Sequence, residues 1–188
     1  VHRYLATSVG FLILVITVAS WVEYSRSRAQ RGAGAAVSAP VLSPWWPTVT
    51  LVWVCIQGAF GALTVTMKLF PAIVTLHLVG GLVLLFLLCA QAVRRTQIVQ
   101  AVAPVPVPTA VRRWLWGALV LLSIQVVLGG WVSTNYAVLA CTEFPGCQGS
   151  LWPPMDFRQG FQVWRELGVL QGGGYISFAG VTASHYAD

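Results

Sequence analysis

Four long apolar stretches constrain the fold of this chain more than any other feature. Each comes close to the roughly 20 residues that an α-helix needs to cross a bilayer. The chain of 188 residues is 57% hydrophobic and only 9% charged, whereas soluble domains carry about 25% charged residues. We therefore predict an all-α, polytopic membrane helical bundle with four complete transmembrane helices and the start of a fifth at Val181–Asp188. The four stretches are Tyr4–Val22, Thr48–Leu63, Ala72–Val93 and Trp114–Val132.

The basic residues predict how these helices are oriented. The chain has 11 Lys and Arg residues and a formal charge of +6, and most of the basic residues fall in two alternate connectors. Cytoplasmic connectors are enriched in Lys and Arg, so we expect both connectors inside and the first residue outside. The basic patches have no base-stacking aromatics interleaved, and nucleic-acid binding is not expected. The residues concerned are Arg26, Arg28, Arg31, Arg94, Arg95, Arg112 and Arg113.

Two connectors divide the chain into a partial first bundle and the beginning of a second. Ala29–Pro47 is rich in Gly, Ala, Ser and Pro, and Ala101–Thr109 reads AVAPVPVPT, both typical of flexible or extended linkers. Because the chain starts on a histidine at a helix mouth and stops inside a fifth span, we expect it to be a piece of a longer protein, lacking both ends. The expected divisions are 1–100 for the first bundle with a cytoplasmic linker at 23–47, 101–113 for a second linker, and 114–188 for the second bundle with an external loop at 133–180.

Two histidines, His2 and His77, lie near the outer ends of the first and third stretches. With the inner ends taken at Trp21 and Val93, a rise of 1.5 Å per residue places them about 28 Å and about 24 Å away along the helices. Ionisable groups at membrane depth are costly and mark functional sites by default. Facing neutral imidazoles in a bundle suit axial ligation of a haem iron. The alternatives are histidines that reach the interface or bond a carbonyl, and Arg3 is either a haem-propionate contact or an interfacial anchor.

Two external cysteines, Cys141 and Cys147, lie in the segment CTEFPGC. They are six residues apart with a proline and a glycine between them, and the outer compartment is oxidising, so a disulfide is geometrically easy. A metal site and reversible thiol chemistry are the alternatives, although no His or third Cys lies nearby to complete a metal site. Cys55 and Cys89 fall inside spans and are expected to be small apolar fillers.

The external loop also carries an aromatic segment, Phe157–Leu170. Its apolar residues recur at helical spacing, which predicts an interfacial helix lying flat on the membrane. An ordinary external loop is the equal alternative.

Four segments together resemble the haem A synthases of bacterial and mitochondrial inner membranes. HRYLA at His2–Ala6 is similar to the first haem-ligand motif of that family. GALTV at Gly61–Val65, followed by LFPAIVTLHL to Leu78, is similar to the second. GGWVSTNYAVLACTEFPGCQGSLWPP at Gly129–Pro154 is similar to the family's external cysteine loop, at the cysteine spacing the family uses, and is the most specific segment. ASHYAD at Ala183–Asp188 is similar to the start of the repeated ligand motif in the second half.

The resemblance implies an architecture and a reaction. Members have eight helices in two pseudo-symmetric four-helix bundles, of which the first holds the substrate, haem O, and the second a haem B cofactor. His2 and His77 would then ligate the substrate iron, and His185 would belong to the haem B motif. The implied reaction oxidises a ring methyl of haem O to a formyl group by successive hydroxylations, after which the gem-diol loses water to give haem A for terminal oxidases. A carboxylate three residues before the first histidine motif is implied in catalysis, but that position falls before Val1, so the catalytic residue is unknown.

The resemblance also implies a location and partners. The location would be the bacterial inner membrane, with the cysteine loop on the periplasmic side, and the mitochondrial inner membrane is the alternative. Beside haem O and membrane lipid, the implied partners are haem O synthase and an electron donor such as a ferredoxin.

The chain departs from the family pattern in two respects. The second ligand motif reads His-x-x-His in the family, whereas here His185 is followed three residues later by Asp188. Either that ligand is lost or the end of the chain does not represent the functional sequence. With five helices at most, the chain lacks the last spans, and we expect it to be inactive on its own.

Two other functional classes are alternatives to the synthase. A b-type cytochrome subunit that only passes electrons would also use paired histidines, but typically with haems on both sides of the membrane, and no histidine here lies near the inner end of a span. A transporter or cofactor-free assembly factor would use discontinuous helices with charges near the midplane, which these spans lack. The synthase is therefore the leading hypothesis.

Overall fold

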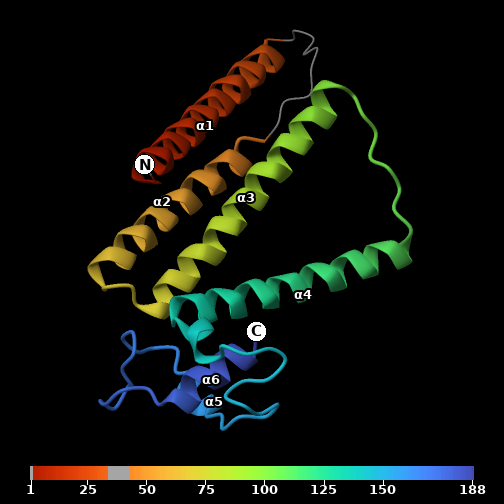
Figure 1. Ribbon diagram of the computed structural model, residues 1–188. Coiled ribbons are helices and arrows are strands. Elements are labelled where there is room, and N and C mark those ends of the chain that lie inside the picture. Colours follow the sequence, from red (N-terminus) through yellow and green to blue (C-terminus); the bar gives the residue numbers. More distant parts are fainter. Residues whose placement is uncertain (1, 34–42) are drawn as a thin grey trace. The chain divides into compact units, whose positions relative to one another are not determined.

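The computed structural model describes residues 2–33 and 43–188 (Figure 1). Within these residues regular structure is helical, with two isolated β-bridges and no named strand, which confirms the all-α prediction. The elements are α1 (His2–Gly32), α2 (Trp45–Thr66), α3 (Pro71–Val99), α4 (Thr109–Thr134), η1 (Ala137–Ala140), α5 (Phe157–Gly160) and α6 (Phe178–Tyr186).

The helices α1 to α4 are each long and apolar enough to cross a membrane. Each contains the corresponding predicted apolar stretch. Only 11% to 22% of the most apolar window of each helix is buried, so most of their apolar side chains face outward. Apolar surface of this extent is unfavourable in water and suits contact with lipid. The chain is therefore a multi-pass membrane protein.

Local sequence signals account for several helix boundaries. Pro71 occupies the first position of α3, and Pro108 directly precedes α4. Proline is tolerated there because its missing N–H would have no partner inside the helix. The predicted external turn between α2 and α3 includes Lys68 and Leu69, whose φ angles are 51° and 60°. This left-handed conformation is uncommon outside glycine, and here it reverses the chain within a few residues.

The connectors are shorter than predicted because the helices extend into them. Helix α1 continues to Gly32, so residues 23–32 of the predicted linker at 23–47 are helical, and residues 34–42 of that linker lie outside the described residues. Helix α3 likewise continues to Val99. The arginines assigned to the connectors therefore lie on helix ends. Hydropathy marks the part of a helix that suits lipid, whereas arginine has good helix propensity and lets the helix continue beyond it.

The chain divides into two compact units, residues 1–59 with 81–106 and residues 60–80 with 107–188. In the first unit, polar side chains connect the long helices. Thr17 Oγ1 on α1 donates a hydrogen bond to the carbonyl of Pro47 on α2 at 3.1 Å. The Gln91 amide on α3 donates to Thr50 Oγ1 on α2, and Thr50 is fully buried. Such bonds hold membrane helices together because the alternative is an unsatisfied polar group in an apolar environment.

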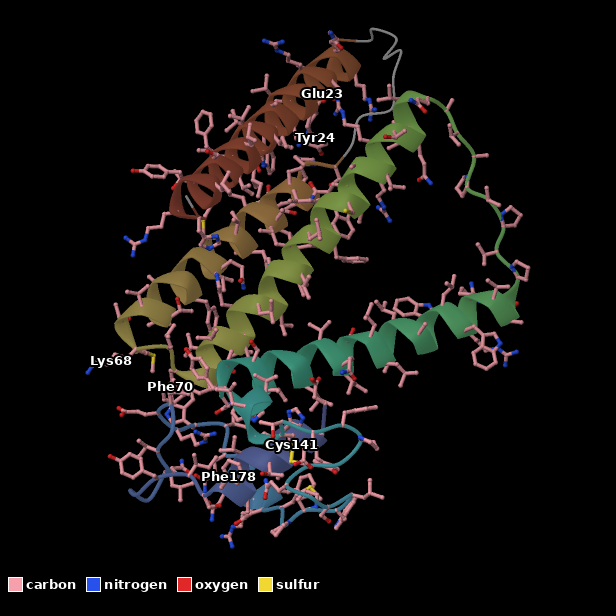
Figure 2. All side chains as sticks on the ribbon, viewed as in Figure 1. Glu23, Tyr24, Lys68, Phe70, Cys141 and Phe178 are labelled. Atoms are coloured by element: carbon pink, nitrogen blue, oxygen red, sulfur yellow. A yellow bond between two sulfur atoms is a disulfide. The ribbon has the colours of Figure 1, made fainter. Side chains whose placement is uncertain are left out.

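The second unit has an apolar core where the short turn between α2 and α3 meets the end of α4. Figure 2 shows Phe70 at this turn. Gly130 lets α4 approach α3 closely, since a Cβ there would lie 3.0 Å from Leu78 Cδ2. The core comprises Phe70, Ala72, Ile73 and Trp131, with Phe60, Met67 and Phe161 packed against it.

The predicted interfacial helix over Phe157–Leu170 is wrong, because only Phe157–Gly160 is helical and the rest of the segment is a loop; its external position stays a prediction. Helix α5 ends at Gly160, whose carbonyl accepts hydrogen bonds from Trp131 Nε1 and from Ser184 Oγ, both at 2.9 Å. The helical spacing predicted that α5 would continue beyond Gly160. Instead, α5 ends there and packs against α6. The helix at the end of the sequence, α6, begins at Phe178, three residues earlier than predicted.

Candidate functional site

His77 lies on the second turn of α3, against the end of α2. A Cβ built on Gly61 of α2 would lie 3.2 Å from Cε1 and 3.6 Å from Nε2 of His77. The first separation is shorter than an ordinary van der Waals contact and the second is an ordinary one, so the missing side chain at Gly61 provides room for the imidazole. The two residues come from the two parts of one predicted motif, which the turn between α2 and α3 brings side by side.

The His77 imidazole has an unmet hydrogen-bonding requirement. Its Nδ1 is buried and has no hydrogen-bond partner among the described residues. A buried polar atom without a partner costs about 1–3 kcal/mol. A flat imidazole in a glycine-lined niche, with bonding capacity still unused, has the chemistry of a ligand-binding side chain, since neutral imidazole is a common metal ligand.

His2 and Arg3 open α1, and both side chains are exposed. They belong to the first unit, whereas His77 belongs to the second. The pairing of His2 with His77 and the propionate contact of Arg3 therefore stay predictions.

Cys141 and Cys147 form the predicted disulfide, with Cα atoms 4.9 Å apart. Figure 2 shows Cys141 and the sulfur–sulfur bond directly after η1. Cys147 is 1% exposed. The two sulfurs are bonded to each other, which argues against the alternative of a metal site at this pair.

The disulfide loop is attached to α6 by side-chain hydrogen bonds. Gln148 Nε2 donates to Thr182 Oγ1 at 2.9 Å, and the Tyr186 hydroxyl donates to the carbonyl of Leu151 at 2.8 Å. Thr182 is fully buried beneath the loop. The loop therefore covers one side of α6, and the disulfide restrains its beginning.

The other two cysteines, Cys55 and Cys89, are free and exposed on their helices. Both lie inside helices that can span a membrane, as predicted, and their role as small apolar fillers stays a prediction.

Replacing Cys141 with serine is expected to destabilise the loop by about 2 kcal/mol, because opening a small covalent ring returns conformational entropy to the unfolded chain. The thermal unfolding midpoint of the full-length protein in detergent should fall, and protease should cut the loop faster. Cys55→Ser is the control because it removes a free, exposed thiol. Equal midpoints for the two variants would contradict a structural role for the disulfide.

His185 and Asp188 lie at the end of α6 and just beyond it. The Nδ1 atom of His185 is buried and, like that of His77, lacks a hydrogen-bond partner in the described part of the chain. Asp188 has a partner on α4: Gln125 Nε2 donates to its Oδ1 at 2.8 Å. A Cβ on Gly129 would lie 3.2 Å from the same oxygen. The carboxylate at the position where the family motif has a second histidine is thus held against α4.

The burial of the Arg165 guanidinium is not predictable from the sequence. Arg165 is 3% exposed, donates to Asn135 Oδ1, and lies over the Trp131 ring with 6.0 Å from Cζ to the centroid. Desolvation lowers the pKa of Arg165. In the sequence it is one of two arginines in the segment Phe157–Leu170, and no local pattern distinguishes it from a surface residue. Its contacts join the loop after α5 to the end of α4.

A conventional multidentate metal site is not found within residues 2–33 and 43–188, where no three His, Cys, Asp or Glu side chains gather in a suitable arrangement. The candidate site therefore consists of separate histidines. Such histidines suit a ligand that supplies its own remaining metal ligands, as a porphyrin does.

Comparisons with known proteins place the chain in a family. A family model described as cytochrome oxidase assembly protein (COX15-CtaA) matches residues 1–185. The chain is 34% identical over 181 residues to a heme A synthase of Shewanella oneidensis, covering 90% of this chain and 48% of that relative. It is 28% identical over 174 residues to a heme A synthase of Symbiobacterium thermophilum, covering 89% of this chain and 53% of that relative.

The chain spans about half the length of the curated relatives it matches. No solved structure matches it. Because the family model extends over nearly the whole chain, from the first residue to His185, this chain belongs to the family of cytochrome oxidase assembly proteins.

Proposed function

We propose that this protein is a haem A synthase, which oxidises a ring methyl of haem O to a formyl group and so supplies haem A for terminal oxidases. Conversion of the methyl to a formyl carbon removes four electrons in two successive hydroxylations, so an external oxidant must take them up, and the gem-diol then loses water. Family membership and the two relatives named heme A synthase support this activity. The structural observation that carries the proposal is the His77 imidazole in its glycine niche on a membrane-spanning helix.

His77 is the proposed axial ligand of the substrate iron. Its ring lies on an apolar helix, and one of its nitrogens is buried without a partner among the described residues. A haem iron would occupy one nitrogen of this ring, so the ring gains an interaction when haem binds. Gly61 would leave room for the ring beside α2, where any side chain would press on it.

His2 is the proposed second ligand of haem O, from the start of α1. Arg3 would then meet a propionate, because a guanidinium forms charge-assisted, often paired hydrogen bonds with a carboxylate. Both side chains are exposed, so each can contact a bound group, which supports this role.

A haem B cofactor in the second bundle is the proposed electron-transfer group, and His185 is the residue of this chain that would hold it. The buried, unpartnered nitrogen of His185 fits such a ligand. When bound, haem B supplies one-electron chemistry. Asp188 would keep its hydrogen bond with Gln125 on α4 and would not ligate the iron.

The proposed location is the bacterial inner membrane with the disulfide loop in the periplasm. The arginines near the ends of α1 and α3 and the start of α4 support this orientation, because basic residues favour the cytoplasmic side. Haem O synthase is the proposed supplier of substrate, and a ferredoxin-like protein the proposed electron donor.

Extracting the haem from the purified full-length protein tests the proposal. Chromatography is expected to show haem O, its hydroxylated forms or haem A beside haem B. Haem B alone would favour a b-type cytochrome that passes electrons, and the absence of any haem would refute a haem-based function.

Gly61→Ala tests the niche directly. The new methyl would press on Cε1 of His77 from 3.2 Å, so the ring must tilt, and we expect roughly tenfold weaker retention of haem O, comparable to the loss of an outer-shell partner of a metal ligand. The optical and paramagnetic spectra of the ligated iron should change as well. Gly58→Ala, on the same helix with nothing within 4 Å, is the matched control. Alanine favours a helix over glycine at both positions, so equal effects of the two variants would argue against the niche.

A further inference from the structure

We propose that the first unit holds a binding site for the headgroup phosphate and adjoining acyl chain of an anionic phospholipid. A cavity of about 320 Å³ lies among the later part of α1, the start of α2 and the end of α3. This volume is at the lower end of the range for ligand pockets, enough for a headgroup and the first part of a chain. The proposal is independent of the proposed haem chemistry.

Helix α1 lines the cavity with one face that changes from apolar to charged. Its lining residues are Ile16, Ala19, Ser20 and Glu23. Their spacing of three, four and seven residues places them on one side of an α-helix. The face runs over about 10 Å from the isoleucine to the carboxylate, at 1.5 Å per residue.

Helix α3 lines the cavity with a face of the same spacing, which also begins with an apolar residue and ends with a charged one. Its residues at this spacing are Leu88, Gln91, Ala92 and Arg95. Arg95 Nη1 lies 3.5 Å from Glu23 Oε2, so the charged ends of the two faces meet at one level. Figure 2 shows Glu23 near the later end of α1. The cavity is therefore apolar toward Ile16 and Leu88 and charged at the other end, which we call the rim.

The rim has an excess of positive charge. Glu23 and Arg95 offset each other, and theirs is the ion pair found in the described part of the chain. Arg94 also lines the cavity, and its guanidinium lies 5.2 Å from the centre of the Trp46 ring. Contact with a ring face leaves the N–H groups at the edge of the guanidinium free to donate. Arg94 can thus accept an anion without breaking an ion pair.

An anionic phospholipid matches both ends of this gradient. Its phosphate would lie at Arg94 and Arg95, and its chain would follow the apolar part of the faces toward Ile16 and Leu88. The helices that line the cavity span a membrane, so lipid is the molecule at hand. Basic pockets between membrane helices recognise anionic headgroups in this manner. Inorganic phosphate alone would leave the apolar part unfilled.

Lipid binding to the purified full-length protein in detergent tests the site. Native mass spectrometry and the thermal midpoint would be followed with phosphatidylglycerol, with phosphatidylcholine of the same chains, and with inorganic phosphate. We expect phosphatidylglycerol to remain bound and to raise the midpoint, since a ligand that binds only the folded state stabilises it. Equal retention of phosphatidylcholine, or the same stabilisation by inorganic phosphate alone, would overturn the proposal.

Two variants are expected to change the affinity for phosphatidylglycerol in opposite directions, which makes the test specific. Arg94→Gln should weaken phosphatidylglycerol binding about fivefold, the loss of one basic group near a lipid phosphate. Glu23→Gln should strengthen it, because it frees Arg95 and removes the negative charge from the rim. Arg113→Gln, on α4 and outside the cavity lining, is the control. If Glu23→Gln weakens binding, or if Arg113→Gln matches Arg94→Gln, the cavity is not the lipid site.

Discussion

Haem O should be lost from the full-length protein when His77 is replaced by alanine, while the protein remains folded. The substitution removes the proposed axial ligand and leaves the α-helix intact, since alanine is the best helix former. Loss of an outer-shell partner already costs roughly 10–100-fold in metal affinity, so loss of the ligand itself should cost at least about as much. The haem O fraction of the extracted pigment and the spectrum of the remaining haem are the measurements.

A neighbouring variant separates ligation from general damage to α3. Leu76 precedes His77, and its side chain is exposed, so Leu76→Ala should keep the haem O content of the parent protein. Retention of all haem O by His77→Ala would remove His77 from the site, and equal loss in both variants would point to a disturbed helix. The haem B fraction should stay constant in both, because its proposed ligand is His185 on α6.

Gly160→Ala is expected to lower the stability of the second unit by about 2 kcal/mol, within the usual range for overpacking. A Cβ at Gly160 would lie 2.5 Å from the Gly180 carbonyl oxygen and 2.9 Å from Ser184 Oγ. The first of these atoms is backbone and cannot rotate away, so α5 and α6 must separate. That movement would also strain the hydrogen bonds that the Gly160 carbonyl accepts from Trp131 and Ser184. The thermal midpoint should fall by roughly 4–8 °C.

The control for Gly160→Ala is Gly172→Ala, in the same external segment. No atom lies within 4 Å of a Cβ at Gly172, so this variant should unfold at the parent temperature or slightly above it. Limited proteolysis of the loop should follow the same order. A Gly160→Ala protein that is as stable as the Gly172→Ala protein would show that α5 and α6 do not pack closely.

The four membrane spans were predictable from the sequence because they depend on local properties. A run of apolar residues long enough to cross the bilayer leaves few alternatives to a helix, since every backbone polar group must then be bonded internally. The ends of these helices were harder to predict. α1 and α3 continue past their apolar stretches into arginine-bearing turns, where hydropathy falls but helix propensity does not.

The candidate site was predictable in its residue types and only partly in its geometry. The pairing of Cys141 with Cys147 follows from close spacing along the chain, and the structure confirms it. The histidines were recognisable because ionisable groups are rare in apolar stretches. The role of Gly61 as the wall beside His77 was not derivable, because it arises only when α2 folds back on α3.

The amino-acid sequence alone therefore determined which segments enter the membrane, which histidines are candidate ligands and which cysteines can form a disulfide. Each of these depends on composition or on short spacing along the chain. Tertiary structure decided the rest. It buried Arg165 beside Trp131 and ended α5 at Gly160, where helical spacing predicted a longer helix. It also arranged matching faces of α1 and α3 around one cavity. These features depend on contacts between residues distant in the chain, whose energies exceed local preferences.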